Sequence, residues 1–186
     1  EGTEINGAGP KIPPRKLQQL MEKLQMLKKG DVLVLAGSIP GSLPDNIYRQ
    51  TMAGLDGRGI LTVVDATKDL LLHTLKYHPF LIKPNQYELE LRVGRKLDSV
   101  QDIKEAALEC VAEGIGIVAV SMGGDGAFIT DGRESLFAPV LDVDVRSTVG
   151  AGDSMVTGFL HGIALGEGLA GIFRRGVAAG TAAVTT

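Results

Sequence analysis

The stretch Ser147-Thr148-Val149-Gly150-Ala151-Gly152-Asp153-Ser154 is the one around which the fold is organised, because an apolar helical pattern begins directly after it, at Met155. It predicts a strand end, a glycine turn and a helix N-terminus. Glycines 150 and 152 lack a Cβ, so the backbone can turn sharply there and approach a ligand closely. The first N–H groups of a helix have no partner within the helix, and the helix dipole adds partial positive charge. The turn is therefore a candidate anion site.

One carboxylate, that of Asp153, stands in the same turn. It could simply cap the helix, since Asp is a preferred capping residue. Alternatively, an anion site beside a carboxylate base suits phosphoryl transfer to a hydroxyl, which needs charge stabilisation and a proton acceptor. Two other phosphate motifs are excluded. Met155 occupies the third small position of G-x-G-x-x-G/A, and the chain contains no G-x-x-x-x-G-K-[ST] string.

The composition predicts an ordinary globular protein, since 44% of the 186 residues are hydrophobic and 22% are charged. We expect one domain over residues 1–186, with 1–14 as an extended Gly/Pro-rich lead-in. A net charge of −3, with no Trp and few aromatic residues, argues against nucleic-acid binding. No apolar run suits a membrane span, and Cys110 is the single cysteine, so we expect a cytoplasmic protein with Cys110 buried in a helix.

Apolar runs alternate with helical patterns along the chain, which predicts an α/β fold with a parallel sheet. The runs 32–36, 60–65 and 117–120 predict buried strands, the first buried on both faces, and 80–82 predicts a shorter one. Asp131-Gly132 predicts a β-hairpin between 127–130 and 134–139. Helices are expected at 13–29, from 44 to 55, at 68–76, from 86, at 97–113, from 155 to 163 (deeply buried) and at 172–184.

Three loops follow strand ends, where ligands bind in open α/β sheets. The Gly37-Ser38 pair is a candidate to touch substrate, although the loop composition alone favours a plain turn. Lys83 and Glu88 could contact nucleotide phosphate and orient hydrated magnesium, but Asn85 and Glu88 also have the spacing of a capping box. The glycines of the 121–126 loop allow close approach to a flat or charged ligand.

Four strings fall in one order: AGSIPG (36–41), KPNQYE (83–88), SMGGDG (121–126) and STVGAGDSM (147–155). Together they resemble the ribokinase-like sugar kinases of the PfkB family. The resemblance covers essentially the whole chain, and the GAGD turn is its most specific part. Within the family, STVGAGDSM and the string TEINGAGP (3–10) are most similar to 1-phosphofructokinases and tagatose-6-phosphate kinases.

This resemblance implies a three-layer α/β/α fold with a mostly parallel sheet and a C-terminal β-hairpin. It also implies phosphorylation of a sugar phosphate with ATP and Mg²⁺, and we expect fructose 1-phosphate to be converted to fructose 1,6-bisphosphate. Tagatose 6-phosphate, fructose 6-phosphate, and nucleoside or vitamin kinase activity remain alternatives. So does a nucleotide-binding module without catalysis, although Asp153 argues against it because a carboxylate repels phosphate.

The resemblance also assigns roles to residues. Asp153 would be the base that takes the proton from the sugar hydroxyl, and the N–H groups of Gly150, Ala151 and Gly152 would hold the moving phosphoryl group. Glu88 would orient magnesium, directly or through water, and Gly37, Ser38 and Asp153 would face the substrate. The nucleotide-binding residues would be Lys83, Asn85, Glu88, Ser121, Met122, Gly123, Gly124, Asp125, Gly126, Val177, Gly180 and Thr181.

The family's N-terminal strands, its sugar-gripping glycine pair, its phosphate-holding basic residues and most of its β lid have no counterpart in this sequence. We therefore expect little or no kinase activity from these 186 residues alone, and measurable turnover of fructose 1-phosphate would refute that expectation. An uncovered sheet edge and apolar face should also favour self-association. For the full-length protein we expect a homodimer.

Overall fold

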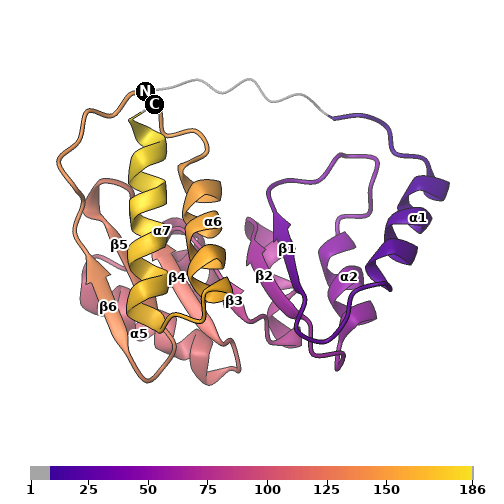
Figure 1. The fold of residues 1–186 in the computed structure, drawn as a ribbon, viewed down its shortest axis with the longest axis horizontal. Helices are drawn as coiled ribbons and strands as arrows, with labels where there is room; N and C mark the ends of the chain where they lie inside the picture. The colour runs from indigo at the N-terminus through magenta and orange to yellow at the C-terminus, as the bar shows by residue number, and fades with distance from the viewer. Residues whose placement is uncertain (1–8, 186) are drawn as a thin grey trace.

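The computed structural model describes residues 9–185, so residues 1–8 of the expected lead-in lie outside the described residues. One six-stranded sheet runs in the order β1-β2-β3-β4-β5-β6 (Figure 1). β1 to β4 are parallel, whereas β5 pairs antiparallel with both β4 and β6. The strands are β1 (Val32–Ala36), β2 (Leu61–Asp65), β3 (Leu81–Ile82), β4 (Ile117–Ser121), β5 (Ala127–Thr130) and β6 (Ser135–Ala138). The predicted hairpin is thus confirmed as β5–β6.

Helices cover both faces of the sheet. They are α1 (Pro14–Leu24), α2 (Ile47–Leu55), α3 (Lys68–Leu72), α4 (Gln86–Val93), α5 (Val100–Ala112), α6 (Ala151–Ala164) and α7 (Leu169–Val184), with 3₁₀ turns at Leu75–Tyr77 and Gly123–Asp125. Successive strand residues point to opposite faces. Val63 accordingly packs with α6 and α7, while its neighbour Val64 packs with α2 to α5. The three-layer α/β/α fold is therefore confirmed.

β1 corrects one prediction, because the run 32–36 is not buried on both faces. Leu35 is buried, but Val32 and Val34 are 41% and 37% exposed. Within residues 9–185, β1 has β2 as its one neighbour, and α6 and α7 leave β1 uncovered (Figure 1). The predicted strand is confirmed, but the neighbours that would bury it on both faces are not among the described residues. Among the residues that the structure describes, the expected uncovered edge and apolar face are both present.

Several helix boundaries differ from their predictions. α1 ends at Leu24 rather than at residue 29, and α2 begins at Ile47 rather than at Pro44. α5 starts later than predicted because the Ser99 hydroxyl caps it by accepting the Asp102 N–H at 3.1 Å. α7 begins three residues earlier than predicted. These shifts leave the order of elements unchanged.

The organising stretch at 147–154 does not follow a strand, so that part of the prediction is wrong. The chain leaves β6 at Ala138, and residues 139–149, here called the strap, contain no helix or strand. Gly150 then forms the N-cap of α6 with φ +80°, a left-handed conformation that costs glycine little. Asp153 is the third residue of the helix, and no side-chain hydrogen bond caps α6. Asp153 is therefore not a capping residue.

The remaining predictions concern burial. α6 buries Val156 and Phe159 but leaves Thr157 exposed, so the expectation of deep burial holds for one face only. Cys110 is fully buried in α5, as predicted, and this burial raises the pKa of its thiol to about 11. Among residues 9–185, no helix combines the length and the apolar character that crossing a membrane requires.

Candidate active site

The carboxyl ends of β1 to β4 form a row along one edge of the sheet. The Gly37 N–H after β1 donates to the carbonyl of Asp65 at the end of β2, at 2.9 Å. The Ser121 N–H at the end of β4 donates to the Pro84 carbonyl after β3, at 3.1 Å. The predicted substrate pair Gly37-Ser38 therefore lies at one end of the row, and the 121–126 loop begins at the other.

A buried ion pair stands in the middle of this row. The Lys83 ammonium lies 3.1 Å from the Asp65 carboxylate, and the two side chains are only 7% and 16% exposed. Burial raises the pKa of the Asp65 carboxyl, Lys83 opposes this shift, and the charge of Asp153 adds to it. The sequence reasoning missed Asp65, although a carboxylate at the carboxyl end of the ILTVVD run was the available signal.

The N-terminus of α6 lies directly against this ion pair. A Cβ built on Gly152 would lie 3.2 Å from the Lys83 Nζ and 3.9 Å from an Asp65 carboxylate oxygen. A glycine at this position therefore lets the helix end approach the ammonium. Asp65, Lys83, Gly152 and Asp153 form one group, here called the central cluster.

Backbone N–H groups at the N-terminus of α6 lie beside the central cluster. The Ala151 N–H donates to the Thr148 carbonyl at 3.3 Å, and the Ser154 N–H donates to the Gly150 carbonyl at 2.9 Å. Within residues 9–185, the N–H groups of Gly150, Gly152 and Asp153 have no hydrogen-bond partner. Two of the three N–H groups expected to hold a phosphoryl group are thus free, and Asp153 supplies a further one.

The capping box suggested by the spacing of Asn85 and Glu88 is present at the start of α4. The Asn85 Oδ1 accepts the Glu88 N–H at 2.8 Å, and the Glu88 Oε2 accepts the Asn85 N–H at 2.9 Å. Burial raises the pKa of the Glu88 carboxyl, whereas the Asn85 bond and Lys83 lower it. In the described part of the chain, the second carboxylate oxygen of Glu88 has no hydrogen-bond partner, so the cap leaves it free for a hydrated cation.

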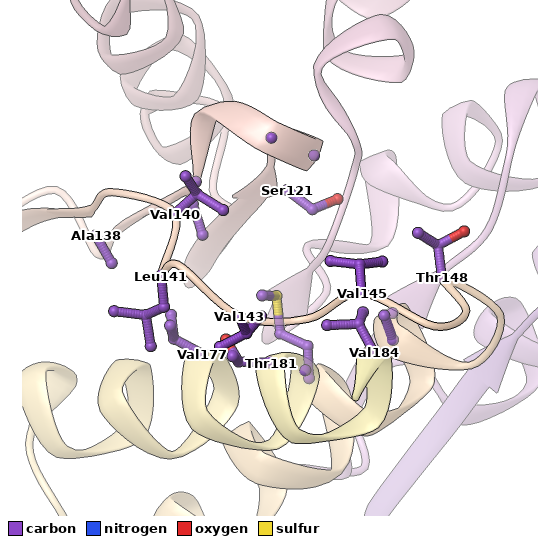
Figure 2. Close-up of a pocket in the computed structure, with 18 of the residues that line it drawn as sticks. Ser121, Ala138, Val140, Leu141, Val143, Val145, Thr148, Val177, Thr181 and Val184 are labelled. Carbon is purple, nitrogen blue, oxygen red and sulfur yellow. The ribbon is translucent and has the colours of Figure 1, made fainter. Parts of the chain in front are cut away.

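A cavity of about 440 Å³ opens beside the central cluster, between the 121–126 loop, the strap and α7 (Figure 2). Many of the site residues predicted from the sequence line this cavity, namely Asn85, Ser121, Gly123, Gly124, Gly126, Ala151, Gly152, Val177, Gly180 and Thr181. Lys83 and Glu88 lie outside the lining, as do Asp125, Gly150, Asp153 and the Gly37-Ser38 pair. Met122 also lies outside, because its side chain is buried in the core facing α3 to α5.

The strap is the part of this cavity that the sequence reasoning missed. Val140, Leu141, Val143 and Val145 line the cavity opposite Val177, Thr181 and Val184 of α7 (Figure 2). Val140 and Leu141 are more than half exposed. The apolar residues at 140, 141, 143 and 145, between the predicted hairpin and the Gly150 turn, were the signal available in the sequence, because loops are usually polar.

Comparison with known protein families shows which family the chain belongs to. Residues 1–186 match the profile of the pfkB family carbohydrate kinases over their whole length. The chain belongs to this family. A curated 1-phosphofructokinase of Bacillus subtilis is 39% identical over 180 residues, which are 97% of this chain and 59% of that protein. Its counterpart in Borreliella burgdorferi is 36% identical over 181 residues, with the same coverage.

Solved structures of pfkB family members agree with the fold. Phosphofructokinase-2 from Escherichia coli in complex with fructose-6-phosphate matches with a TM-score of 0.87 and 33% identity, covering 93% of this chain and 57% of that one. The tetrameric inhibited form of the same enzyme matches with a TM-score of 0.85 and 35% identity, covering 92% and 57% of the two chains. This chain thus spans about three-fifths of the length of its pfkB relatives.

Proposed function

We propose that residues 1–186 form the ATP-binding and catalytic part of a kinase that phosphorylates a hydroxyl of a sugar phosphate. The observation that carries this proposal is the junction between the cavity and the central cluster. Ala151 and Gly152 line the cavity and also belong to the first turn of α6. A nucleotide in the cavity would therefore reach the free N–H groups, Lys83 and Asp153 with its phosphates.

The charges at this junction support a bound anion. The Lys83 ammonium and the positive end of the α6 dipole face each other, with the partly buried Asp65 carboxylate paired to the ammonium and the Asp153 carboxylate nearby. A triphosphate would accept hydrogen bonds from the free N–H groups and from the ammonium, and Mg²⁺ bound to it would offset its repulsion from the two carboxylates. The size of the cavity also suits a ligand such as ATP, because its volume lies within the range of about 300 to 1,000 Å³ that is usual for ligand pockets.

Magnesium would be held by few protein groups. Within residues 9–185, no three His, Cys, Asp or Glu side chains gather closely enough to hold a metal ion by themselves. This arrangement suits Mg²⁺, which in kinases is usually bound by one or two carboxylates, waters and the substrate phosphates. Glu88, with its free carboxylate oxygen, is the residue proposed to orient it. Bound Mg²⁺ would neutralise charge on the transferring phosphate.

Asp153 is the proposed catalytic base. It is exposed and close enough to Asp65 to affect its pKa, and it does not cap its helix. Its carboxylate is thus available to accept the proton of an attacking hydroxyl while the neighbouring N–H groups of α6 hold the phosphoryl group. The acceptor would approach from the Gly37-Ser38 side of the row, opposite the nucleotide cavity.

Fructose 1-phosphate is the proposed acceptor, because the curated relatives described above are named 1-phosphofructokinases. Fructose 6-phosphate is the second candidate, because it is bound in a similar structure of E. coli phosphofructokinase-2. The test is to compare kcat/KM for fructose 1-phosphate, fructose 6-phosphate and tagatose 6-phosphate with the full-length protein, meaning the natural polypeptide that carries residues 1–186. The highest value is expected for fructose 1-phosphate. A homodimer of that protein remains our proposal, to be tested by sedimentation.

Glu88→Gln separates the two roles of Glu88. The amide oxygen can still accept the Asn85 N–H bond, so the helix cap stays, but the negative charge that attracts magnesium is lost. We expect the Mg²⁺ concentration needed for half-maximal activity to rise about tenfold or more, as for other residues that support metal sites. Glu88→Ala should add a loss of about 1 kcal/mol in stability, because it removes the acceptor of the Asn85 N–H while the Asn85 side chain still caps the helix. If Glu88→Gln needs no more magnesium than the unmodified protein, Glu88 serves only in the capping box and does not orient the metal.

A further inference from the structure

We propose that Tyr48 of α2 is a positioning residue for the sugar phosphate, because its hydroxyl holds the Gly37-Ser38 loop in the shape that receives the acceptor. This inference rests on the proposed function and concerns the end of the strand row that lies away from the nucleotide cavity. It follows from the hydrogen bonds of the loop, from the packing of the Tyr48 ring and from the open space beside Gly37.

The loop after β1 offers room and a free polar group. Gly37 has φ +77°, in the left-handed region that favours glycine. A Cβ built on Gly37 would meet no heavy atom within 4 Å, and Gly37 and Ser38 are both exposed. Within residues 9–185, the Ser38 hydroxyl has no hydrogen-bond partner. A ligand could therefore approach the backbone closely here and bond to Ser38, provided that the loop keeps one shape.

Two hydrogen-bonding groups from other elements hold this loop. The Gly37 N–H donates to the carbonyl of Asp65 at the end of β2, at 2.9 Å. The Tyr48 hydroxyl donates to the Ala36 carbonyl at 2.7 Å and, more weakly, to the Gly37 carbonyl at 3.3 Å. Tyr48 lies 11 positions beyond Gly37, so its side chain closes the whole connection between β1 and α2.

The ring of Tyr48 is anchored where a fixed hydroxyl is needed. Tyr48 is the second residue of α2, and its ring packs against the hydrophobic core that faces α2 to α5. A tyrosine side chain has only two rotatable χ angles, so packing of the ring also fixes the hydroxyl. Burial raises the pKa of this hydroxyl, and the charge of Asp65 adds to the rise. The group therefore stays a donor, and it stands close to the central cluster.

A loop that is already fixed costs less entropy to order when a ligand binds. Without the Tyr48 hydroxyl the loop would sample other shapes, and the apparent affinity for the acceptor would fall with the fraction that remains competent. Neither Tyr48 nor the Gly37-Ser38 pair lines the nucleotide cavity. The loss should therefore fall on the acceptor and leave ATP binding as it is.

The first experiment compares Tyr48→Phe with the unmodified full-length protein, using the acceptor that gives the highest kcat/KM. Tyr48→Phe keeps the packed ring and removes the hydroxyl. We expect KM for the acceptor to rise about threefold to tenfold, the usual contribution of one hydrogen bond. KM for ATP and kcat should stay within about twofold, because a group that binds substrate and transition state equally affects KM alone.

Tyr77→Phe is the matched control. Tyr77 packs against the same hydrophobic core but lies in the 3₁₀ turn before β3, at the amino end of the strands. This variant loses the same atom from the same kind of residue, and all three kinetic constants should stay within about twofold, as for other substitutions remote from a site. Thermal unfolding of both variants checks that the fold is retained.

A double-mutant cycle with Ser38→Ala tests whether Tyr48 acts through the loop. If it does, the rise in acceptor KM for the double variant should be smaller than the product of the two single rises, because each change removes part of the same contact. A purely structural role of Tyr48 would not produce this coupling.

An unchanged acceptor KM in Tyr48→Phe, or an equal rise in KM for ATP, would overturn this inference and leave the proposed function standing. Single effects that simply multiply in the double variant would overturn it as well, since Tyr48 and Ser38 would then act independently. If the unmodified full-length protein phosphorylates no sugar phosphate, the proposed function falls and this inference falls with it.

Discussion

Replacing Asp153 with asparagine is expected to lower kcat for phosphorylation of the sugar phosphate by a factor of about 10² to 10⁴, the usual contribution of a general base. An amide has nearly the same shape but cannot accept the proton of the attacking hydroxyl. Because Asp153 does not cap α6, the fold should be retained. ATP should bind as well as before or slightly more tightly, since a negative charge beside its phosphates is removed.

The measurement combines steady-state kinetics, ATP titration and thermal unfolding of the full-length protein. Asp142→Asn is the matched control, because Asp142 is an exposed carboxylate on the strap and lies outside the cavity lining. It should change kcat by less than about threefold, in keeping with surface substitutions. If Asp153→Asn behaves like this control, Asp153 is not the base.

Gly158→Ala is expected to lower the free energy of unfolding by about 1 to 3 kcal/mol. A Cβ on Gly158 would contact the Arg175 carbonyl and lie 2.7 Å from the Gly176 Cα, so it meets backbone atoms of α7. The two helices would have to move apart. Since Val177 and Thr181 of α7 line the cavity, ATP affinity should fall as well.

Gly54→Ala provides a control of the opposite sign. Gly54 also lies inside a helix, α2, but its added Cβ would have the Gln25 Nε2 at 3.7 Å as its nearest neighbour, which is ordinary contact. This substitution should raise the free energy of unfolding by about 0.5 to 1 kcal/mol, because alanine favours helices over glycine. Urea denaturation measures both variants, and a stability gain in Gly158→Ala would refute the close packing of α6 on α7.

Local sequence patterns were sufficient wherever the determining forces were local. The Asp131-Gly132 turn predicted the β5–β6 hairpin, and the spacing of Asn85 and Glu88 predicted the capping box. The order of strands and helices followed from apolar runs alternating with helical patterns. The strand-end loops led to Lys83 and Ser121 because parallel strands bring their carboxyl ends to one edge.

Features that depend on distant partners were not predictable in this way. The apolar run of β1 resembles that of β4, and only the absence of covering elements among the described residues makes Val32 and Val34 exposed. The strap alternates apolar and acidic residues as a strand does, yet it pairs with no strand, and its partner α7 comes later in the chain. Asp65 gains its place in the site through Lys83, which lies 18 positions further along the sequence.

The central claim is that a nucleoside triphosphate binds where the cavity meets the N-terminus of α6. Its most direct test is the amide NMR spectrum of the ¹⁵N-labelled chain with and without Mg·ATP. The amide signals of Gly150, Gly152 and Asp153 are expected to shift together with those of residues 121–126, while those of Val32 and Val34 in β1 stay unchanged. Unchanged signals at the start of α6, or shifts confined to β1 and its surroundings, would contradict it.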